Sequence, residues 1–164
     1  MLRLNRLTDY AIVTLVRLVE HSVGPDAPLS ARQIAEMENL PEPMVKNALK
    51  SLHRAQFVAS VRGARGGYRL AEDPKQITLI QIIEAIEGPM AITPCCDDSE
   101  DDSCMACRLA PGDRAGPSIQ FVNDRVRSVL NDISLHQMVE SIGSHQVAGV
   151  VLTVDSQLSG KASL

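Results

Sequence analysis

The chain begins with amphipathic segments whose apolar residues recur at helical spacing. The first follows Thr8, a candidate helix N-cap, and continues with apolar positions three and four residues apart until Gly24 and Pro25 interrupt it. Ser30 and Gln33 then have the spacing of a capping box, which predicts the start of a short second helix. Two helices are therefore expected before residue 40.

A third helix is predicted from about Pro43, after a tight turn that contains Asn39 and Pro41. Its spacing predicts a buried side made of Val45, Ala48, Leu49 and Leu52. The other faces carry polar and basic residues, namely Lys46, Asn47 and Lys50. Exposed charges are often only a solvated helix face, but two helices joined by a short turn are typical of a helix-turn-helix unit that binds DNA.

A basic hairpin follows this unit directly. Residues 57–62 have a strand-like composition, 63–67 form a glycine-rich turn, and 68–70 form a second short strand-like run. Three arginines lie at the base and tip of this hairpin: Arg62, Arg65 and Arg69. An ordinary surface turn is the alternative interpretation. A helix-turn-helix followed at once by a basic hairpin favours a winged helix-turn-helix that binds double-stranded DNA, with these arginines at the phosphates or minor groove.

The pattern changes after residue 75. Thr78 and Gln81 predict another capped helix that ends at Gly88, and a long loop of about residues 89–117 separates it from a helix of about 118–133. The apolar residues of that last helix have heptad spacing: Ile119, Val122, Val126, Val129 and Ile133. Such a seam favours a homodimer, although it also fits an amphipathic helix that packs on its own domain.

Two short features end the chain. Ser134 and Gln137 predict a last short helical turn, and residues 144–164 form a tail that includes a strand-like run at 147–154. We therefore divide the chain into a winged-helix domain at 1–75, a segment at 76–143 with the loop and the dimerisation helix, and a tail without an assigned role.

Charge is distributed unevenly along the chain. The formal net charge is −4, but residues 1–70 hold ten Lys and Arg against six Asp and Glu, whereas the remainder is acidic. The basic half coincides with the predicted DNA-binding unit, which is the half that phosphate contacts require. No apolar run is long enough to span a membrane, and charges interrupt the apolar stretch at the N-terminus, so a cytoplasmic protein is expected.

All four cysteines fall within thirteen residues of the long loop: Cys95, Cys96, Cys104 and Cys107. In a chain that we expect to be cytoplasmic, such a cluster favours metal binding or redox chemistry over a structural disulfide. Adjacent Cys95 and Cys96 do not easily face one centre, which predicts three thiolates and one further ligand. An iron–sulfur cluster and zinc both fit. A reversible disulfide also remains open, and Cys104 and Cys107 have the spacing of a redox dithiol, but no βαβ pattern surrounds them to favour a thiol-redox enzyme.

Several segments resemble a known family. The opening MLRLNRLTDYAI, the block LSARQIAEMENLP, the hairpin VRGARGGYRLA and the segment ITLIQIIEAIEGP are similar to signatures of the iron–sulfur-dependent winged-helix regulators of the IscR and NsrR type. The similarity runs from residue 1 to about residue 140, and EGPMAITPCC is most similar to the branch that regulates the SUF assembly operon. The resemblance implies a mainly α fold with a small β-hairpin wing and a long C-terminal dimerisation helix.

The same resemblance implies a function. It points to a DNA-binding repressor of iron–sulfur assembly genes, not an enzyme, that responds to cluster, iron, redox or nitric oxide status. The family's cysteine loop matches Cys95, Cys104 and Cys107, with Cys96 competing for the first place, and Asp9 matches an acidic ligand contributed across the dimer. A 2Fe–2S cluster is favoured over a 4Fe–4S cluster, with zinc as the alternative. Gln56 departs from the family, which commonly has glycine there.

Overall fold

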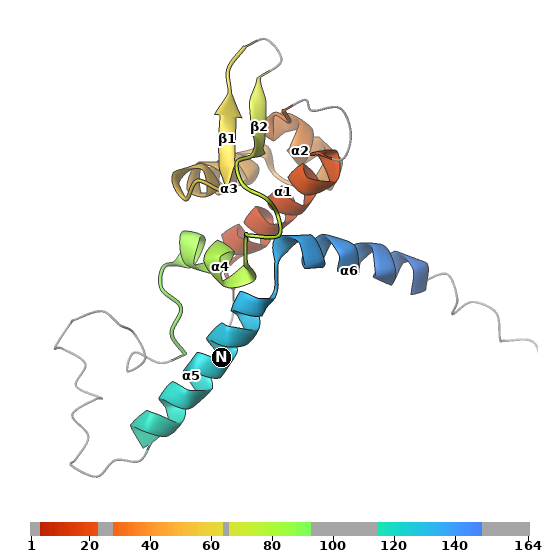
Figure 1. Ribbon diagram of the computed structural model, residues 1–164. Coiled ribbons are helices and arrows are strands. Elements are labelled where there is room, and N and C mark those ends of the chain that lie inside the picture. Colours follow the sequence, from red (N-terminus) through yellow and green to blue (C-terminus); the bar gives the residue numbers. More distant parts are fainter. Residues whose placement is uncertain (1–3, 23–27, 64–65, 93–114, 149–164) are drawn as a thin grey trace, which may run out of the picture.

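The computed structural model describes residues 4–22, 28–63, 66–92 and 115–148. Its elements, in chain order, are α1 (Arg6–Ser22), α2 (Ala31–Glu38), α3 (Glu42–Arg54), β1 (Val58–Val61), β2 (Gly67–Leu70), α4 (Leu79–Glu87), α5 (Ala115–Asp132) and α6 (Leu135–Ala148). Figure 1 shows the β1–β2 hairpin at one end of the molecule and α5 extending away from the other. The predicted fold, mainly α with a small β-hairpin wing, is confirmed.

One aliphatic core holds the helices together. Leu15, Ile34 and Leu49, one from each of the first three helices, are fully buried in it. Ile82 of α4 and Leu135 of α6 belong to the same core and are also fully buried. Each Å² of apolar surface that is buried stabilises the fold by about 25 cal/mol. This cluster is therefore the main source of stability in the described part of the chain.

The helix start signals were mostly predicted correctly. Ser30 caps α2 through Gln33 N–H at 3.2 Å, and Thr78 N–H donates to Gln81 Oε1 at 2.9 Å before α4. The prediction that Thr8 caps α1 was wrong, because Asn5 accepts the N–H of Thr8 at 3.0 Å through its own side chain. The helix therefore starts earlier, at Arg6, and Thr8 is fully buried inside its first turn.

The wing is clamped to the segment that precedes α2. Tyr68 exchanges two backbone hydrogen bonds with Leu29, at 2.8 and 3.0 Å, so a short third strand contact lies beside the hairpin. A Cβ atom added at Gly67 would lie 2.5 Å from the carbonyl of Leu29. Glycine is therefore required at this position because two backbones approach closely.

The C-terminal helices differ from the predicted ones. The helix expected from residue 118 begins at Ala115. The last helix was expected to be a short turn, but α6 has 14 residues and continues to Ala148. Leu135 anchors the start of α6 in the core, and residues 147 and 148 of the expected strand-like run belong to this helix. The rest of the strand-like run, at 149–154, lies outside the described residues.

Candidate nucleic-acid interface and loop anchor

Helix α3 buries the side that its sequence predicted. Its residues with no or almost no exposed surface are Val45, Ala48, Leu49 and Leu52. Lys46, Asn47 and Lys50 are exposed, as expected for the outer face of a recognition helix. Pro41 precedes the helix at its N-cap, and Pro43 in the first turn fixes the backbone without loss of a needed N–H group.

Two pairs of oppositely charged side chains lie on α2 and α3. Arg32 pairs with Glu36 at 2.7 Å on α2, and Lys46 pairs with Glu42 at 2.8 Å on α3. The hydrogen bond from Lys46 and its charge lower the pKa of the Glu42 carboxyl, and Arg32 acts in the same direction. The hydrogen bond and charge of Glu36, with the charge of Glu42, raise the pKa of Arg32. Each basic side chain is thus partly neutralised.

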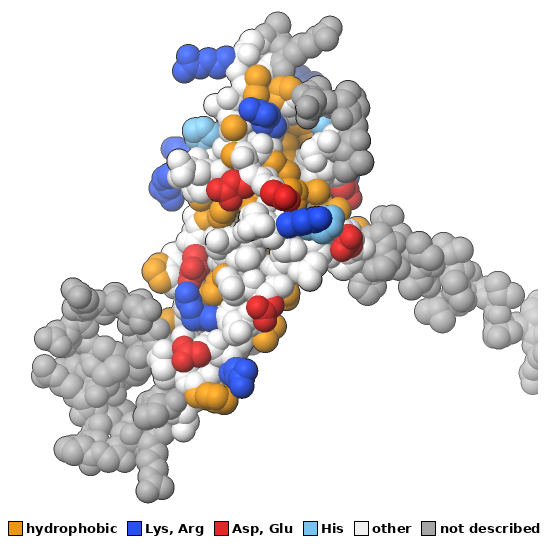
Figure 2. Space-filling model, in the orientation of Figure 1, with side chains coloured by type: hydrophobic (Ala, Val, Ile, Leu, Met, Phe, Trp, Pro, Cys, Tyr) orange, Lys and Arg blue, Asp and Glu red, His pale blue; other side chains and the backbone are white. Residues whose placement is uncertain are grey.

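The remaining predicted DNA-contacting residues divide into two groups. Lys50, Arg62 and Arg69 are exposed, and none of them has an ion pair within the part of the chain that the structure describes. Arg65 lies outside the described residues. In Figure 2 the Lys and Arg side chains at the end of the molecule that carries the wing stand apart from the Asp and Glu side chains, which lie further down in this view. This end therefore offers cations to a phosphate backbone.

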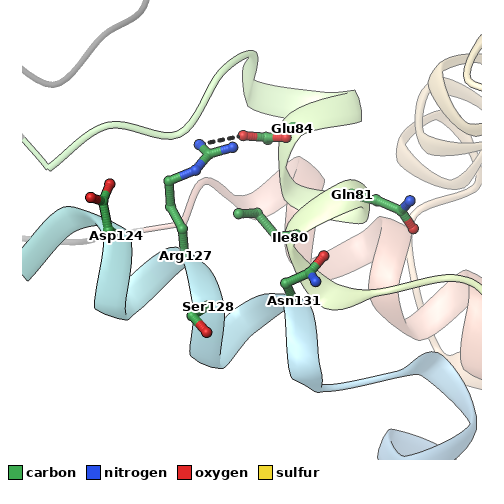
Figure 3. Close-up of a pocket in the computed structure, with 7 residues that line it drawn as sticks. All are labelled: Ile80, Gln81, Glu84, Asp124, Arg127, Ser128 and Asn131. Carbon is green, nitrogen blue, oxygen red and sulfur yellow. Dashed lines mark hydrogen bonds and ion pairs between the residues drawn. The ribbon is translucent and has the colours of Figure 1, made fainter.

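The start of the cysteine loop is hydrogen-bonded to α4 and α5. Arg127 of α5 donates through Nη1 to Glu84 Oε1 of α4 and to the Met90 carbonyl, both at 2.7 Å. Glu84 Oε1 also accepts the N–H of Met90 at 3.1 Å. Figure 3 shows Arg127 reaching from α5 toward Glu84, across one end of an open cavity of about 370 Å³ between the two helices. Neither Arg127 nor Glu84 was singled out by the sequence.

A buried amide completes this anchor. Asn123 is only 2% exposed, although most of its neighbours on α5 are exposed, and its Oδ1 accepts the N–H of Ile92 at 3.1 Å. The sequence signal that could have identified Asn123 is its position, as a polar residue, on the inner face of an amphipathic helix. We call residues Glu84, Met90, Ile92, Asn123 and Arg127 the loop anchor.

Asp9 follows a residue that is hydrogen-bonded to the end of α4. The neighbouring Thr8 hydroxyl donates to Glu87 Oε1, and the Asn5 N–H donates to the same oxygen at 3.0 Å. Asp9 itself is exposed. The first turn of α1 is therefore fixed to the last turn of α4, next to the point where the cysteine loop begins.

The predicted cysteine ligands lie outside the described residues: Cys95, Cys96, Cys104 and Cys107. Within residues 4–22, 28–63, 66–92 and 115–148, no three His, Cys, Asp or Glu side chains come together in a way that could hold a metal ion. In the same ranges, no helix combines the length and the apolar character needed to cross a membrane. The ligand set therefore stays a prediction.

Comparison with known proteins gives the family. A family model described as iron-dependent transcriptional regulators, Rrf2, matches residues 4–141. The chain belongs to the Rrf2 family. This Rrf2-family chain is a helix-turn-helix transcriptional regulator of DNA-binding type and not an enzyme, which removes the thiol-redox enzyme considered from its dithiol spacing.

Individual relatives agree with this assignment. An HTH-type transcriptional regulator of Synechocystis sp. is 39% identical over 54% of this chain and 61% of its own length, so the match leaves more than a third of that relative uncovered. The HTH-type transcriptional repressor NsrR of Streptomyces coelicolor is 30% identical over 66% of this chain and 72% of its own.

Solved structures agree as well. The T. potens IscR structure, 26% identical, has a TM-score of 0.66 and covers 88% of this chain and 91% of its own. The structure of CymR, the global cysteine regulator of B. subtilis, is 27% identical with a TM-score of 0.64, covering 86% and 98%. Both support the winged-helix fold.

Proposed function

We propose that this chain is a homodimer that binds a double-stranded DNA operator through α3 and the wing. It represses iron–sulfur assembly genes in the cytoplasm and responds to cluster, iron, redox or nitric oxide status through a cysteine-ligated iron–sulfur cluster. The observation that carries the DNA-binding proposal is the exposed basic surface: Lys50, Arg62 and Arg69 are exposed and unpaired in the described part of the chain, beside Lys46 and Asn47. Arg65 is included on its sequence position alone.

Lys50 provides the direct test of that surface. We expect Lys50→Ala to weaken binding to all duplex sequences and to reduce the slope of log K against log salt by about 1, because one phosphate contact is lost. Lys75→Ala is the matched control, since Lys75 is also exposed but lies outside α3 and the wing. Fluorescence anisotropy at several salt concentrations measures both quantities. Equal effects of the two substitutions would contradict the assignment.

The dimer proposal rests on α5. Val122 and Val129 of the predicted heptad seam are 50% and 59% exposed, and Ile119 is 39% exposed. Exposed apolar residues repeating along one helix face are typical of a surface that a second copy covers. We expect Val129→Asp to give monomers in sedimentation velocity, while Ser128→Asp, at an exposed position off the seam, leaves the dimer intact. A dimer that survives Val129→Asp would exclude this interface.

The sensor proposal rests on the donor set and on the loop anchor. Thiolates of Cys95, Cys104 and Cys107 with a fourth ligand from Asp9 or Cys96 fit an iron–sulfur cluster. A carboxylate oxygen as the fourth ligand would hold one iron weakly. A 2Fe–2S cluster is favoured over 4Fe–4S. The anchored Ile92 precedes Cys95 by three residues, so the loop starts from a fixed point. The cluster, when bound, would be the group that is lost under iron starvation, oxidation or nitric oxide.

The absorption spectrum of protein purified without oxygen, with iron, sulfide and zinc analysis, tests this proposal. A brown protein with equal iron and sulfide supports it, and Cys95→Ala, Cys104→Ala and Asp9→Ala then identify ligands by loss of iron. Colourless protein with stoichiometric zinc would favour a structural zinc site instead. Protein with neither metal would favour a thiol switch, which is the second candidate.

The loop anchor supplies a physical route from the cysteine loop to the DNA-binding surface. Arg127 holds the loop start and α4 together, and α4 packs against α1 and α3 in the common core. Ligand binding in the loop shifts the population of arrangements in which α4 and α5 are held together. We expect Arg127→Met to retain iron but to reduce the difference in operator affinity between loaded and cluster-free protein. An unchanged difference would exclude this route.

A further inference from the structure

The recognition helix begins with a carboxylate. Glu42 is the first residue of α3, and its recorded partner is Lys46 Nζ at 2.8 Å, one helical turn later. Lys46 is exposed and Glu42 is half-buried, and the pair lies on the surface that the proposed function turns toward DNA. The N-terminal residues of a recognition helix are the ones that reach base edges in the major groove. An acidic side chain at this position therefore needs an explanation.

A carboxylate in the major groove has few possible partners. Ionised carboxylates only accept hydrogen bonds, while phosphates and most base-edge atoms are acceptors too. The donors in the major groove are the amino groups of cytosine and adenine. Adenine also presents its N7 acceptor beside the amino group, which repels the second carboxylate oxygen, whereas cytosine presents no acceptor there. Cytosine is therefore the base that a carboxylate favours.

A purely structural role explains less of the arrangement. Negative charge in the first turn favours a helix through its dipole, and Glu42 contributes to that. The preceding N-cap, Pro41, makes no side-chain capping bond, and the Glu42 carboxylate pairs with Lys46 one turn later. The pair thus keeps a basic side chain occupied at the DNA-facing end of the helix.

We propose that Glu42 is a specificity-determining residue of the DNA interface, which exchanges Lys46 for the 4-amino group of a cytosine when α3 enters the major groove. Lys46 then becomes free to contact a phosphate. At a site without that cytosine, Glu42 either remains paired, which withholds Lys46 from the phosphate, or lies unpaired among acceptors. The pair therefore lowers affinity for non-operator DNA more than for the operator. This inference rests on the proposed DNA-binding function.

The test is a selection from random duplex DNA with the full-length protein, followed by affinity measurements on the selected site and its single-base variants. We expect the wild type to select a cytosine at one position of each half-site. Glu42→Gln should reduce the preference for that base pair by about tenfold and raise affinity for unrelated DNA. Glu42→Asp keeps the charge and the helix dipole contribution but shortens the reach, so it should lose the same preference.

Glu36→Gln is the matched control, because Glu36 also pairs with a cation four residues away on its helix. It should raise affinity for all DNA and leave the selected sequence unchanged. Selection of an identical motif by wild type, Glu42→Gln and Glu42→Asp would overturn the inference while leaving DNA binding intact. Failure of the wild type to select any sequence would overturn the inference and the proposed function together. Thermal unfolding establishes that each variant is folded.

Discussion

Removal of the Asn123 side chain is the sharpest test of the loop anchor. Asn123 is 2% exposed, and its Oδ1 accepts the N–H of Ile92 at 3.1 Å in a partly buried position. Asn123→Ala deletes that acceptor and leaves the backbone N–H without a partner. The substitution leaves the ion pair between Arg127 and Glu84 in place, so it isolates one connection between α5 and the start of the loop.

The expected cost follows from that geometry. An unsatisfied buried donor costs about 1–3 kcal/mol, and partial burial places Ile92 N–H in the lower half, at about 1.5 kcal/mol. If the anchor opens only when the whole domain unfolds, this loss lowers Tm by about 3–6 °C. If the anchor opens locally, Tm changes little, and hydrogen exchange at Ile92 accelerates by about tenfold.

Calorimetry and amide exchange together distinguish these outcomes. Asp124→Ala, at an exposed neighbouring position on α5, is the control and should change stability by less than about 0.5 kcal/mol. The reasoning is refuted if Asn123→Ala matches the control both in Tm and in exchange at Ile92. That result would mean that the hydrogen bond does not hold the loop start on α5 in solution.

Three further experiments test individual features of the structure. Gly67→Ala forces a Cβ to within 2.5 Å of the Leu29 backbone and should destabilise the domain by about 2–3 kcal/mol in urea unfolding; an unchanged midpoint would exclude this close approach. Gln56→Gly relieves a positive φ of 66° and should stabilise by about 0.5–1 kcal/mol by the same measurement, whereas a loss would mean that the Gln56 side chain contributes contacts. A double-mutant cycle of Arg127→Met and Glu84→Gln should give a coupling energy of only about 1 kcal/mol, because the two side chains are 36% and 29% exposed and solvent screens the pair. Additive effects of the two substitutions on stability would contradict the ion pair.

Local sequence patterns predicted the winged-helix unit well because its elements depend on neighbouring residues. The Ser30–Gln33 capping box, the buried side of α3 and the strands around the glycine turn all appear where periodicity and turn chemistry put them. Gln56 has a left-handed backbone, a conformation that glycine adopts most readily, so the structure gives a physical reason for the glycine that the resemblance implies at this position. These features are encoded within a few residues, so one sequence suffices to find them.

Features that depend on distant partners were not predictable in the same way. Thr8 has the chemistry of an N-cap, but its hydroxyl donates to Glu87, which is remote in sequence, and Asn5 takes the capping position instead. In the sequence Asn123 looks like an ordinary polar residue, because its partner, the N–H of Ile92, lies 31 residues away along the chain. The start of α6 likewise involves the burial of Leu135 in a core that earlier helices build. In each case a tertiary contact decides between local alternatives.

The arrangement of the helices limits how a change in the proposed sensor loop reaches DNA. Helices α1, α3 and α4 share a close-packed aliphatic core in which Leu15, Leu49 and Ile82 are fully buried, so deformation inside one winged-helix unit is costly. Helix α5 instead extends away from the wing, exposes apolar residues and is joined to α4 by the Arg127 pair. A shift in that joint reorients α5 with little change to the core. In the proposed dimer, such a shift alters the distance between the two recognition helices, and half-site spacing is the property of an operator that is most sensitive to that distance.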